Sequence, residues 1–377
     1  MEPRMSKRVT ALTGIFLTII IMSVDTWADE SRPLVKLESS KATVVIDLGG
    51  GSISEYRLKS NDLNPLQWDS WSFSPTPDQE APMVPRPMGH FLCLDRWGSA
   101  SEAEKANGMT NHGEATQVWW AVSHELESET GKLNVRLRAK LPMAGISVER
   151  SVLMERESSV VIVEEFVTNQ NPIGRIYNIV QHPTIGGPFL DENTIVDSNG
   201  TRGFMQERSM PNPEDPEVHW PKALKMDGTE VDLRFLEGDP SPNVVSYIID
   251  DEYGWVTATS PETGLLLGYI WKTSDYPWLN IWRHVKDGKP VARGLEFGTS
   301  GLHQPGKNLV AKGRIFDRSI YNYIDADETQ SFKYGMFLME IPEGFKGVSS
   351  VSYQEKTLEV FEVGTGRSLK QAAPALF

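Results

Sequence analysis

The chain has 377 residues and a formal net charge of −14, a length that fits one large all-β domain or two ordinary domains. A surface of this sign repels nucleic acid and anionic membranes, so we exclude both as partners. Cys93 is the only cysteine, which excludes an internal disulfide and a zinc site built from cysteines.

Residues 1–28 have the pattern of an export signal. Basic residues precede an apolar core from Val9 to about Val24, and Thr26-Trp27-Ala28 offers small residues for cleavage after Ala28. The alternative is a retained anchor, although the apolar run is shorter than the ~20 residues of a membrane span. We expect a mature protein that is exported to the periplasm or the cell exterior and does not remain in the membrane.

Most of the following sequence alternates with a period of two, which is typical of strands. Ala42–Leu48 and Ser52–Leu58 predict two strands, and Gly49-Gly50-Gly51 between them predicts a turn or bulge. Residues 60–92 are irregular and rich in Pro, Asp and Trp, and loops of this length are usually functional. Helical periodicity is nearly absent, and only residues 101–106 predict one short helix with a serine cap.

The clearest strand is Lys132–Leu141, where apolar and polar residues alternate strictly. This pattern is typical of an antiparallel sheet with one face on a core and the other in water. Ile146–Met154 and Ser159–Thr168 continue the pattern. Residues 191–242 are polar and proline-rich, and we interpret them as a long insertion over one end of the sheet, because strands of the same type resume afterwards.

Further strands are expected to about Val363, and the residues from Gly364 on are expected to be frayed. So many antiparallel strands predict an all-β fold, a large antiparallel β-sandwich. We expect one domain from residue 33 to residue 363, followed by a C-terminal tail over residues 364–377.

Three short segments combine a polar residue with glycine or aromatic neighbours: Asn111–Glu114, Val180–Pro183 and Leu295–Gly298. They lie far apart in the chain, as the parts of a site built from strand ends and loops usually do. Glu296 stands in an apolar, glycine-rich segment, and such a setting raises the pKa of a carboxyl toward the range of a general base. The alternative is structural, with a strand-edge carboxylate and histidines that only hydrogen-bond within the fold.

The order of these motifs resembles the aldose 1-epimerases, or galactose mutarotases. A His-Gly pair at His112 follows a loop, His182 stands 70 residues later at a strand end, and Glu296 lies beside a glycine. Arg96, within Gly89–Gly98, is similar to the family's Gly-Arg stretch upstream of its first histidine. The resemblance covers most of residues 42–345 and implies the galactose mutarotase-like supersandwich fold.

The resemblance also implies catalytic roles. Glu296 would be the base that takes the proton of the anomeric hydroxyl, and His182 would be the acid that protonates the ring oxygen. The ring would then open, the C1–C2 bond would rotate, and closure would give the other anomer. The sequence departs from the family around the second histidine, which here lies between Gln181 and Pro183.

Binding roles follow from the same resemblance. His112 would hydrogen-bond the ring oxygen or a neighbouring hydroxyl, and Arg96 would bind sugar hydroxyls. Trp278 and Trp282 could stack on a pyranose face. The expected partner is a sugar or oligosaccharide, with neither a cofactor nor a metal. Of the histidines outside the motifs, His303 is of interest because it closely follows Glu296.

Two other functions stay open at this point. One is a non-catalytic carbohydrate-binding protein of the same fold, which would keep the groove and aromatic residues but not the acid/base pair. The other is a polysaccharide-processing enzyme on a similar sandwich, which would need two carboxylates at glycosidase separation. Glu296 is the one convincing candidate for such a carboxylate.

Overall fold

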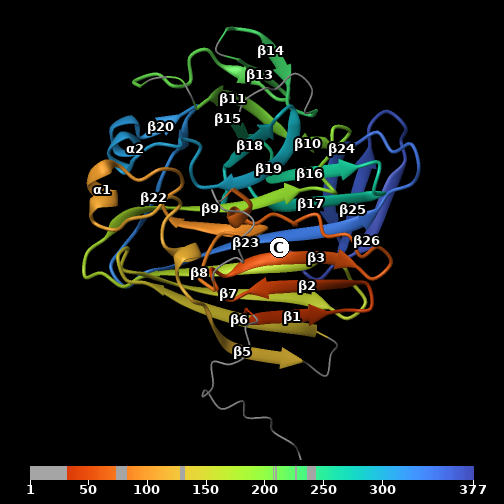
Figure 1. The fold of residues 1–377 in the computed structure, drawn as a ribbon, viewed down its shortest axis with the longest axis horizontal. Helices are drawn as coiled ribbons and strands as arrows, with labels where there is room; N and C mark the ends of the chain where they lie inside the picture. Colours follow the sequence, from red (N-terminus) through yellow and green to blue (C-terminus); the bar gives the residue numbers. More distant parts are fainter. Residues whose placement is uncertain are drawn as a thin grey trace, which may run out of the picture. The chain divides into compact units, whose positions relative to one another are not determined.

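Two large antiparallel sheets account for most of the strands (Figure 1). The computed structural model describes residues 32–73, 83–127, 132–206, 208, 210–225, 227–235 and 243–377. The predicted export signal, residues 1–28, lies outside this part of the chain. Among the residues described, no helix has the length and apolar character needed to cross a membrane.

The first sheet has eleven strands in the order β1-β2-β3-β4-β9-β19-β18-β15-β11-β12, with β22 also pairing with β9. These strands are β1 (Leu34–Glu38), β2 (Ala42–Asp47), β3 (Ser52–Leu58), β4 (His90–Asp95), β9 (Arg175–Gly186), β11 (Gly200–Met205), β12 (Val218–His219), β15 (Asn243–Ile249), β18 (Trp278–Lys286), β19 (Lys289–Gly298) and β22 (Asn322–Ile324).

The second sheet has eight strands in the order β10-β16-β17-β23-β8-β7-β6-β5. These strands are β5 (Ala121–Glu127), β6 (Lys132–Leu141), β7 (Ile146–Glu155), β8 (Val161–Asn169), β10 (Ile195–Ser198), β16 (Tyr253–Ser260), β17 (Leu265–Lys272) and β23 (Thr329–Glu340).

Smaller elements surround the two sheets. The remaining strands are β13 (Lys222–Leu224), β14 (Glu230–Asp232), β20 (Arg314–Ile315), β21 (Arg318–Ser319), β24 (Val348–Gln354), β25 (Thr357–Glu362) and β26 (Ser368–Ala372), and the helices are α1 (Glu102–Ala106) and α2 (Gly306–Lys312). Short 3₁₀ turns lie at Ser70–Phe73 and Ala115–Gln117.

The period-two pattern produces the strands as predicted. In β6 the apolar residues from Val135 to Leu141 are buried, while Arg136, Arg138 and Lys140 between them are exposed. The short helix α1 is also confirmed, with Ser101 as its N-cap and a capping box that includes Glu104. The all-β fold class is therefore confirmed.

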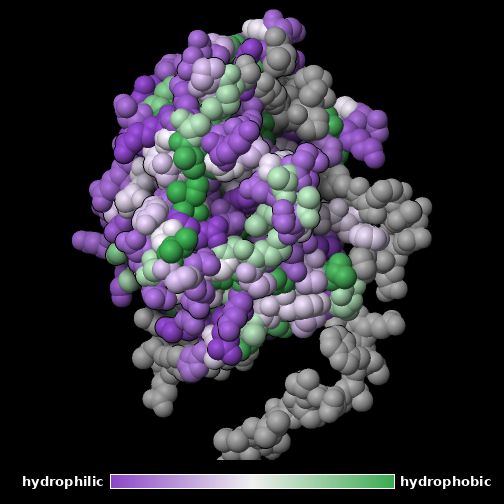
Figure 2. Space-filling view, turned by 90° about the vertical axis from the view of Figure 1, so that its left-hand side faces the viewer, coloured by the Kyte–Doolittle hydropathy of each residue, from purple (hydrophilic) through white to green (hydrophobic). Residues whose placement is uncertain are grey.

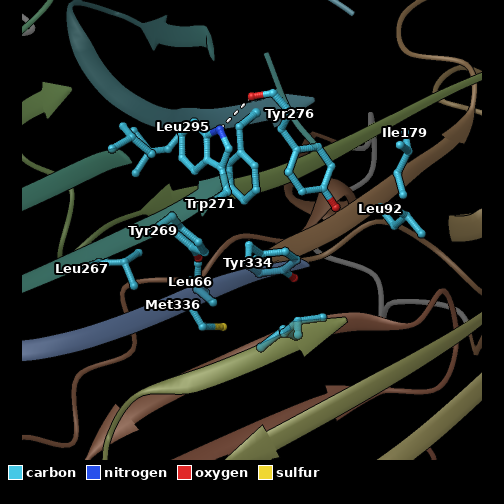
Figure 3. Close-up of a cluster of buried hydrophobic side chains, with 14 of the residues drawn as sticks. Leu66, Leu92, Ile179, Leu267, Tyr269, Trp271, Tyr276, Leu295, Tyr334 and Met336 are labelled. Atoms are coloured by element: carbon cyan, nitrogen blue, oxygen red, sulfur yellow. Dashed lines mark hydrogen bonds between the residues drawn. The ribbon is translucent and has the colours of Figure 1, made fainter. Parts of the chain in front are cut away.

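The main apolar core is built from side chains of both sheets (Figure 3). Leu92, Ile179 and Leu295 come from β4, β9 and β19 of the first sheet. Trp271 of β17 and Tyr334 of β23 come from the second sheet, and both are fully buried. The Trp271 indole donates a hydrogen bond to the carbonyl of Tyr276 (2.8 Å), which satisfies its one polar group inside the core.

A buried polar network also connects the two sheets. Arg150 of β7 and Glu165 of β8 form an ion pair with a shortest N–O distance of 2.6 Å, and both are essentially unexposed. The Gln181 amide of β9 donates to Oε2 of Glu165 (2.9 Å). The Gln181 carbonyl oxygen lies 3.2 Å from Nε2 of His90 on β4. Arg150 and Glu165 therefore neutralise each other, and Glu165 links the ion pair to β9 through Gln181.

The interpretation of residues 191–242 as an insertion outside the sheets is wrong in part. β10 pairs with β16 at the edge of the second sheet, and β11 pairs with β15 in the first. The prolines that dominate the composition lie after β11, whereas Val196 and Phe204 within these strands are fully buried. Composition averaged over the whole segment therefore concealed β10 and β11.

The C-terminal residues are ordered, contrary to the frayed end that we expected. β26 pairs with β25 over five residues. Leu376 is fully buried, and its side chain lies over Gly335 of β23, where an added Cβ would come within 2.5 Å of it. Within β26 only Leu369 packs against the core, while Ala373 and Leu376 beyond the strand are buried in it, so the strand has little apolar alternation.

Removal of Arg150, the cation of the buried network, should cause a large loss of stability. Arg150→Met should lower the free energy of unfolding by about 3–5 kcal/mol, because Glu165 would be left buried without its partner. Equilibrium urea unfolding measures this difference. Glu149→Gln, in the exposed pair of Glu149 with Arg136, is the control and should change stability by less than about 1 kcal/mol. Equal small losses in both variants would contradict the role of the network.

Candidate functional site

One row of side chains crosses five neighbouring strands on the same face of the first sheet. Phe91 of β4 pairs with His182 of β9, and the register of β9 with β19 places His182 beside Glu296. Glu296 pairs with Asn280 of β18, which pairs with Ser246 of β15. Directly paired residues share a face of the sheet, so the register alone brings these five residues together.

Residues next in the chain to members of this row point to the opposite face of the first sheet. Gln181 belongs to the buried network between the sheets, and Phe297 stacks on Trp271 in the main core with ring centroids 4.2 Å apart. Side chains alternate between the two faces of a strand. His182 and Glu296 therefore share the face away from the main core, and a slip of one residue would remove them from it.

His182 and Glu296 are in direct contact. Nε2 of His182 lies 3.1 Å from Oε1 of Glu296, and the two side chains are 6% and 1% exposed. The Trp97 indole donates to the other carboxyl oxygen, Oε2, at 2.5 Å. Nδ1 of His182 lies 2.9 Å from the Thr184 hydroxyl. Each polar atom of the pair thus has a partner, which fixes the orientation of both side chains.

Burial sets the protonation of this pair. It raises the pKa of Glu296 from 4.5 to about 8, although the hydrogen bond from Trp97 acts in the opposite direction. Burial, followed by the nearby His112, lowers the pKa of His182 well below 6.5. Near neutral pH the carboxyl therefore holds a proton and the imidazole is neutral. Oε1 of Glu296 then donates to Nε2 of His182, and the two residues share one proton.

His112 is held in a strained backbone conformation next to this pair. Its φ is 62° and that of Gly113 is 78°, and a Cβ on Gly113 would overlap the carbonyl oxygen of Leu94. The Gly98 amide donates to Nδ1 of His112 at 3.3 Å, so the ring proton is on Nε2. The His112 and His182 rings are 5.5 Å apart. His112 therefore presents a neutral N–H donor near the pair.

Aromatic rings line one side of the pair. Phe91 stacks on His182 with centroids 4.1 Å apart, and Trp68 stacks on Phe91 at 5.7 Å. Trp282 lies 6.0 Å from the His182 ring and is half-buried. Gly294 leaves room here, because an added Cβ would lie 2.8 Å from Oε1 of Glu296. The arrangement offers an apolar aromatic surface beside two hydrogen-bonding groups.

The structure thus brings together four of the six residues chosen from the sequence, and two lie elsewhere. Arg96 forms a two-pronged ion pair with Glu104 of α1 (2.9 Å for one of the two bonds). Helix α1 lies on the left in Figure 1, and Figure 2 views the molecule from that side, where hydrophilic and hydrophobic residues are mixed. Trp278 shares the face of Glu296 but is completely buried in a separate cluster with Phe204, beneath α2. We therefore do not assign sugar contacts to Arg96 or Trp278.

Sequence reasoning missed Trp97 as the donor to Glu296. The two residues are 199 positions apart, and no spacing rule connects an indole to a distant carboxylate. Trp97 does lie inside the Gly89–Gly98 stretch that carries part of the family resemblance. Within the part of the chain that is described, no group of three or more His, Cys, Asp or Glu side chains is arranged to hold a metal ion.

The sequence matches no family model and no curated protein, whereas solved structures resemble the fold. A galactose mutarotase-like protein from Clostridium acetobutylicum superposes with a TM-score of 0.59 at 13% identity, over 82% of this chain and 96% of that one. A galactose mutarotase-like protein from Lactobacillus casei gives 0.56 at 14% identity, over 81% and 100%.

A Klebsiella pneumoniae protein, assigned provisionally as an aldose 1-epimerase, gives a TM-score of 0.57 at 13% identity, over 80% of this chain and 77% of that one. At these identities the likeness establishes the fold alone. The chain has a galactose mutarotase-like β-sandwich fold, as the resemblance in its sequence predicted.

The buried carboxyl predicts a pH-dependent effect of Glu296→Gln on stability. Between pH 4.5 and about 8 the folded protein keeps a proton on Glu296 that the unfolded chain releases. Wild-type stability therefore falls with rising pH through this window, and the variant has no such loss. The free energy of unfolding of Glu296→Gln, minus that of wild type, should therefore increase by a few kcal/mol from pH 5 to pH 9. Urea unfolding at the two pH values measures this change.

Glu217→Gln is the matched control, since Glu217 is exposed, and it should show no such gain. A stability difference between wild type and Glu296→Gln that is the same at both pH values would contradict a raised pKa for this carboxyl.

Proposed function

We propose that this chain binds a neutral aldose at the His182–Glu296 pair and interconverts its two anomers. The observation that carries the proposal is the direct, buried contact between Nε2 of His182 and Oε1 of Glu296 (3.1 Å). A mutarotase must remove one proton from a sugar and add another without changing its own charge. A base and an acid that share one proton meet this requirement.

The ring-opening step balances within the pair. Transfer of the shared proton from Glu296 to His182 produces a carboxylate and an imidazolium. The carboxylate then takes the proton of the anomeric hydroxyl, and the imidazolium gives its proton to the ring oxygen while the C1–O5 bond breaks. The products are an open-chain aldehyde, a protonated Glu296 and a neutral His182, which is the protonation that burial favours at rest.

Ring closure reverses these transfers after the C1–C2 bond rotates. Neutral His182 takes the proton of the O5 hydroxyl as O5 attacks the aldehyde carbon, and Glu296 gives its proton to the carbonyl oxygen. The carboxylate and imidazolium return to the resting pair by passing the proton back. The total proton count of the pair is constant throughout, so the reaction needs no proton from the solvent.

Neighbouring residues support this chemistry by position. The Trp97 indole holds Oε2 of Glu296, which leaves Oε1 as the atom that exchanges the proton. Nε2–H of His112 can donate to a ring oxygen or a hydroxyl as negative charge develops there. The half-buried Trp282 provides a surface on which the apolar face of a pyranose can stack.

The proposal predicts a measurable loss of activity in one variant. Freshly dissolved α-glucose and α-galactose should mutarotate faster with wild-type protein than in buffer, as followed by optical rotation. Glu296→Gln should reduce the added rate by about 10²–10⁴-fold, while Glu217→Gln should retain it. Equal rates for wild type and Glu296→Gln would exclude Glu296 as the base. Unchanged sugar binding in that variant would then favour a carbohydrate-binding protein without catalysis.

We also propose that the chain is exported, on the basis of the charged start, apolar core and small residues within residues 1–28. N-terminal sequencing of protein recovered from the periplasmic or extracellular fraction should begin at Asp29. Recovery only in the membrane fraction, with the sequence intact from Met1, would contradict cleavage and favour a retained anchor.

A further inference from the structure

His303 is a third histidine beside the pair, outside the motifs that suggested the site. It lies in the loop between β19 and α2, and its side chain is half-buried. Its ring contacts the edge of Trp97, with centroids 4.8 Å apart, and lies 5.8 Å from the His112 ring. Trp97 is the donor to Glu296, so His303 packs directly against the residue that orients the base.

The position of His303 is fixed by its backbone. The His303 amide donates to Oε1 of Gln206 at 2.8 Å. The Gln206 amide nitrogen donates to the Ser246 hydroxyl (2.6 Å) and to the carbonyl of Gly301 (2.7 Å). Ser246 belongs to the row of side chains that contains Glu296. His303 is thus tied to the same face of the sheet as the pair.

Gly98 makes room for the His303 ring. A Cβ at Gly98 would lie 2.7 Å from a ring carbon of His303, and the φ of +97° also favours glycine. The same residue donates its amide hydrogen to Nδ1 of His112. Two consecutive residues, Trp97 and Gly98, therefore contact Glu296, His112 and His303. The three polar groups are therefore arranged around the same two residues.

The ring nitrogens of His303 are available for a ligand. Across the residues that the structure describes, neither nitrogen has a hydrogen-bond partner in the protein. Burial lowers the pKa of His303 to about 4, so the ring is neutral near pH 7. A neutral imidazole presents one donor and one acceptor, which suits a hydroxyl group because a hydroxyl can both accept and donate.

We propose that His303 binds a hydroxyl of the same sugar that the His182–Glu296 pair acts on, as a second polar contact beside His112. The inference rests on the proposed function and assigns His303 to substrate recognition, not to proton transfer. The alternative is that His303 only packs against Trp97. Phenylalanine would keep that packing and lose both nitrogens, whereas glutamine would keep a donor and an acceptor.

The experiment combines kinetics with a direct readout of the ring. His303→Phe should raise KM for α-glucose and α-galactose about tenfold, the loss expected for one hydrogen bond, with kcat within about threefold of wild type. His303→Gln should recover part of the loss. His219→Phe is the control and should match wild type, because His219 is exposed and pairs with Glu217.

NMR of protein with ¹⁵N-labelled histidine supplies the readout independent of activity. Saturating galactose or glucose should shift the ring-nitrogen resonances of His303, assigned by their loss in His303→Phe or His303→Gln. Unchanged KM in His303→Phe, or unmoved His303 resonances while those of His182 shift, would overturn this inference and leave the proposed function intact. If Glu296→Gln loses mutarotase activity but the His303 variants show no effect, only the proposed function is supported. Both proposals would be overturned if the wild-type protein does not accelerate mutarotation and if sugar shifts none of its histidine resonances.

Discussion

The hydrogen bond between His182 and Glu296 is the interaction on which the account of this site depends. The Glu296 carboxyl is 1% exposed, and no cation among the described residues lies beside it, so ionising it is costly. The site therefore stabilises it as a neutral acid. Its partners are a neutral imidazole and an indole, and neither adds a formal charge. The result is a pair that can exchange one proton internally, which is useful for reactions that begin and end with the same charge.

Sheet register provides this contact, and the buried network beneath the sheet supports the register. Gln181 and His182 are chain neighbours on β9 but point to opposite faces, one to Glu165 and the other to Glu296. On the inner face the carboxylate of Glu165 is paired with the guanidinium of Arg150. On the outer face no cation of the described chain lies beside Glu296, and burial raises the pKa of its carboxyl to about 8. Environment, and not residue identity, separates the structural carboxylate from the proposed catalytic one.

The sequence predicted the β-sandwich, the antiparallel strands and the short helix at residues 101–106, because these depend on local periodicity and capping. It also identified Glu296, His182, His112 and Trp282, which the structure brings together. It could not show that Trp278 is covered by α2 or that Arg96 is taken by Glu104, since both depend on tertiary packing. The Trp97 contact spans 199 residues and leaves no local pattern. β10, β11 and β26 are short, and neighbouring strands, more than their own composition, hold them in place.

The most direct test of the central claim is the protonation state of Glu296 itself. ¹³C NMR of protein labelled at glutamate side-chain carboxyls, with the Glu296 resonance assigned by its loss in Glu296→Gln, follows this group across pH. The Glu296 carboxyl should be protonated at pH 7, and its resonance should change with an apparent pKa near 8. A Glu296 resonance that titrates near 4.5, with the carboxyl ionised at pH 6, would contradict the shared proton and the mechanism built on it.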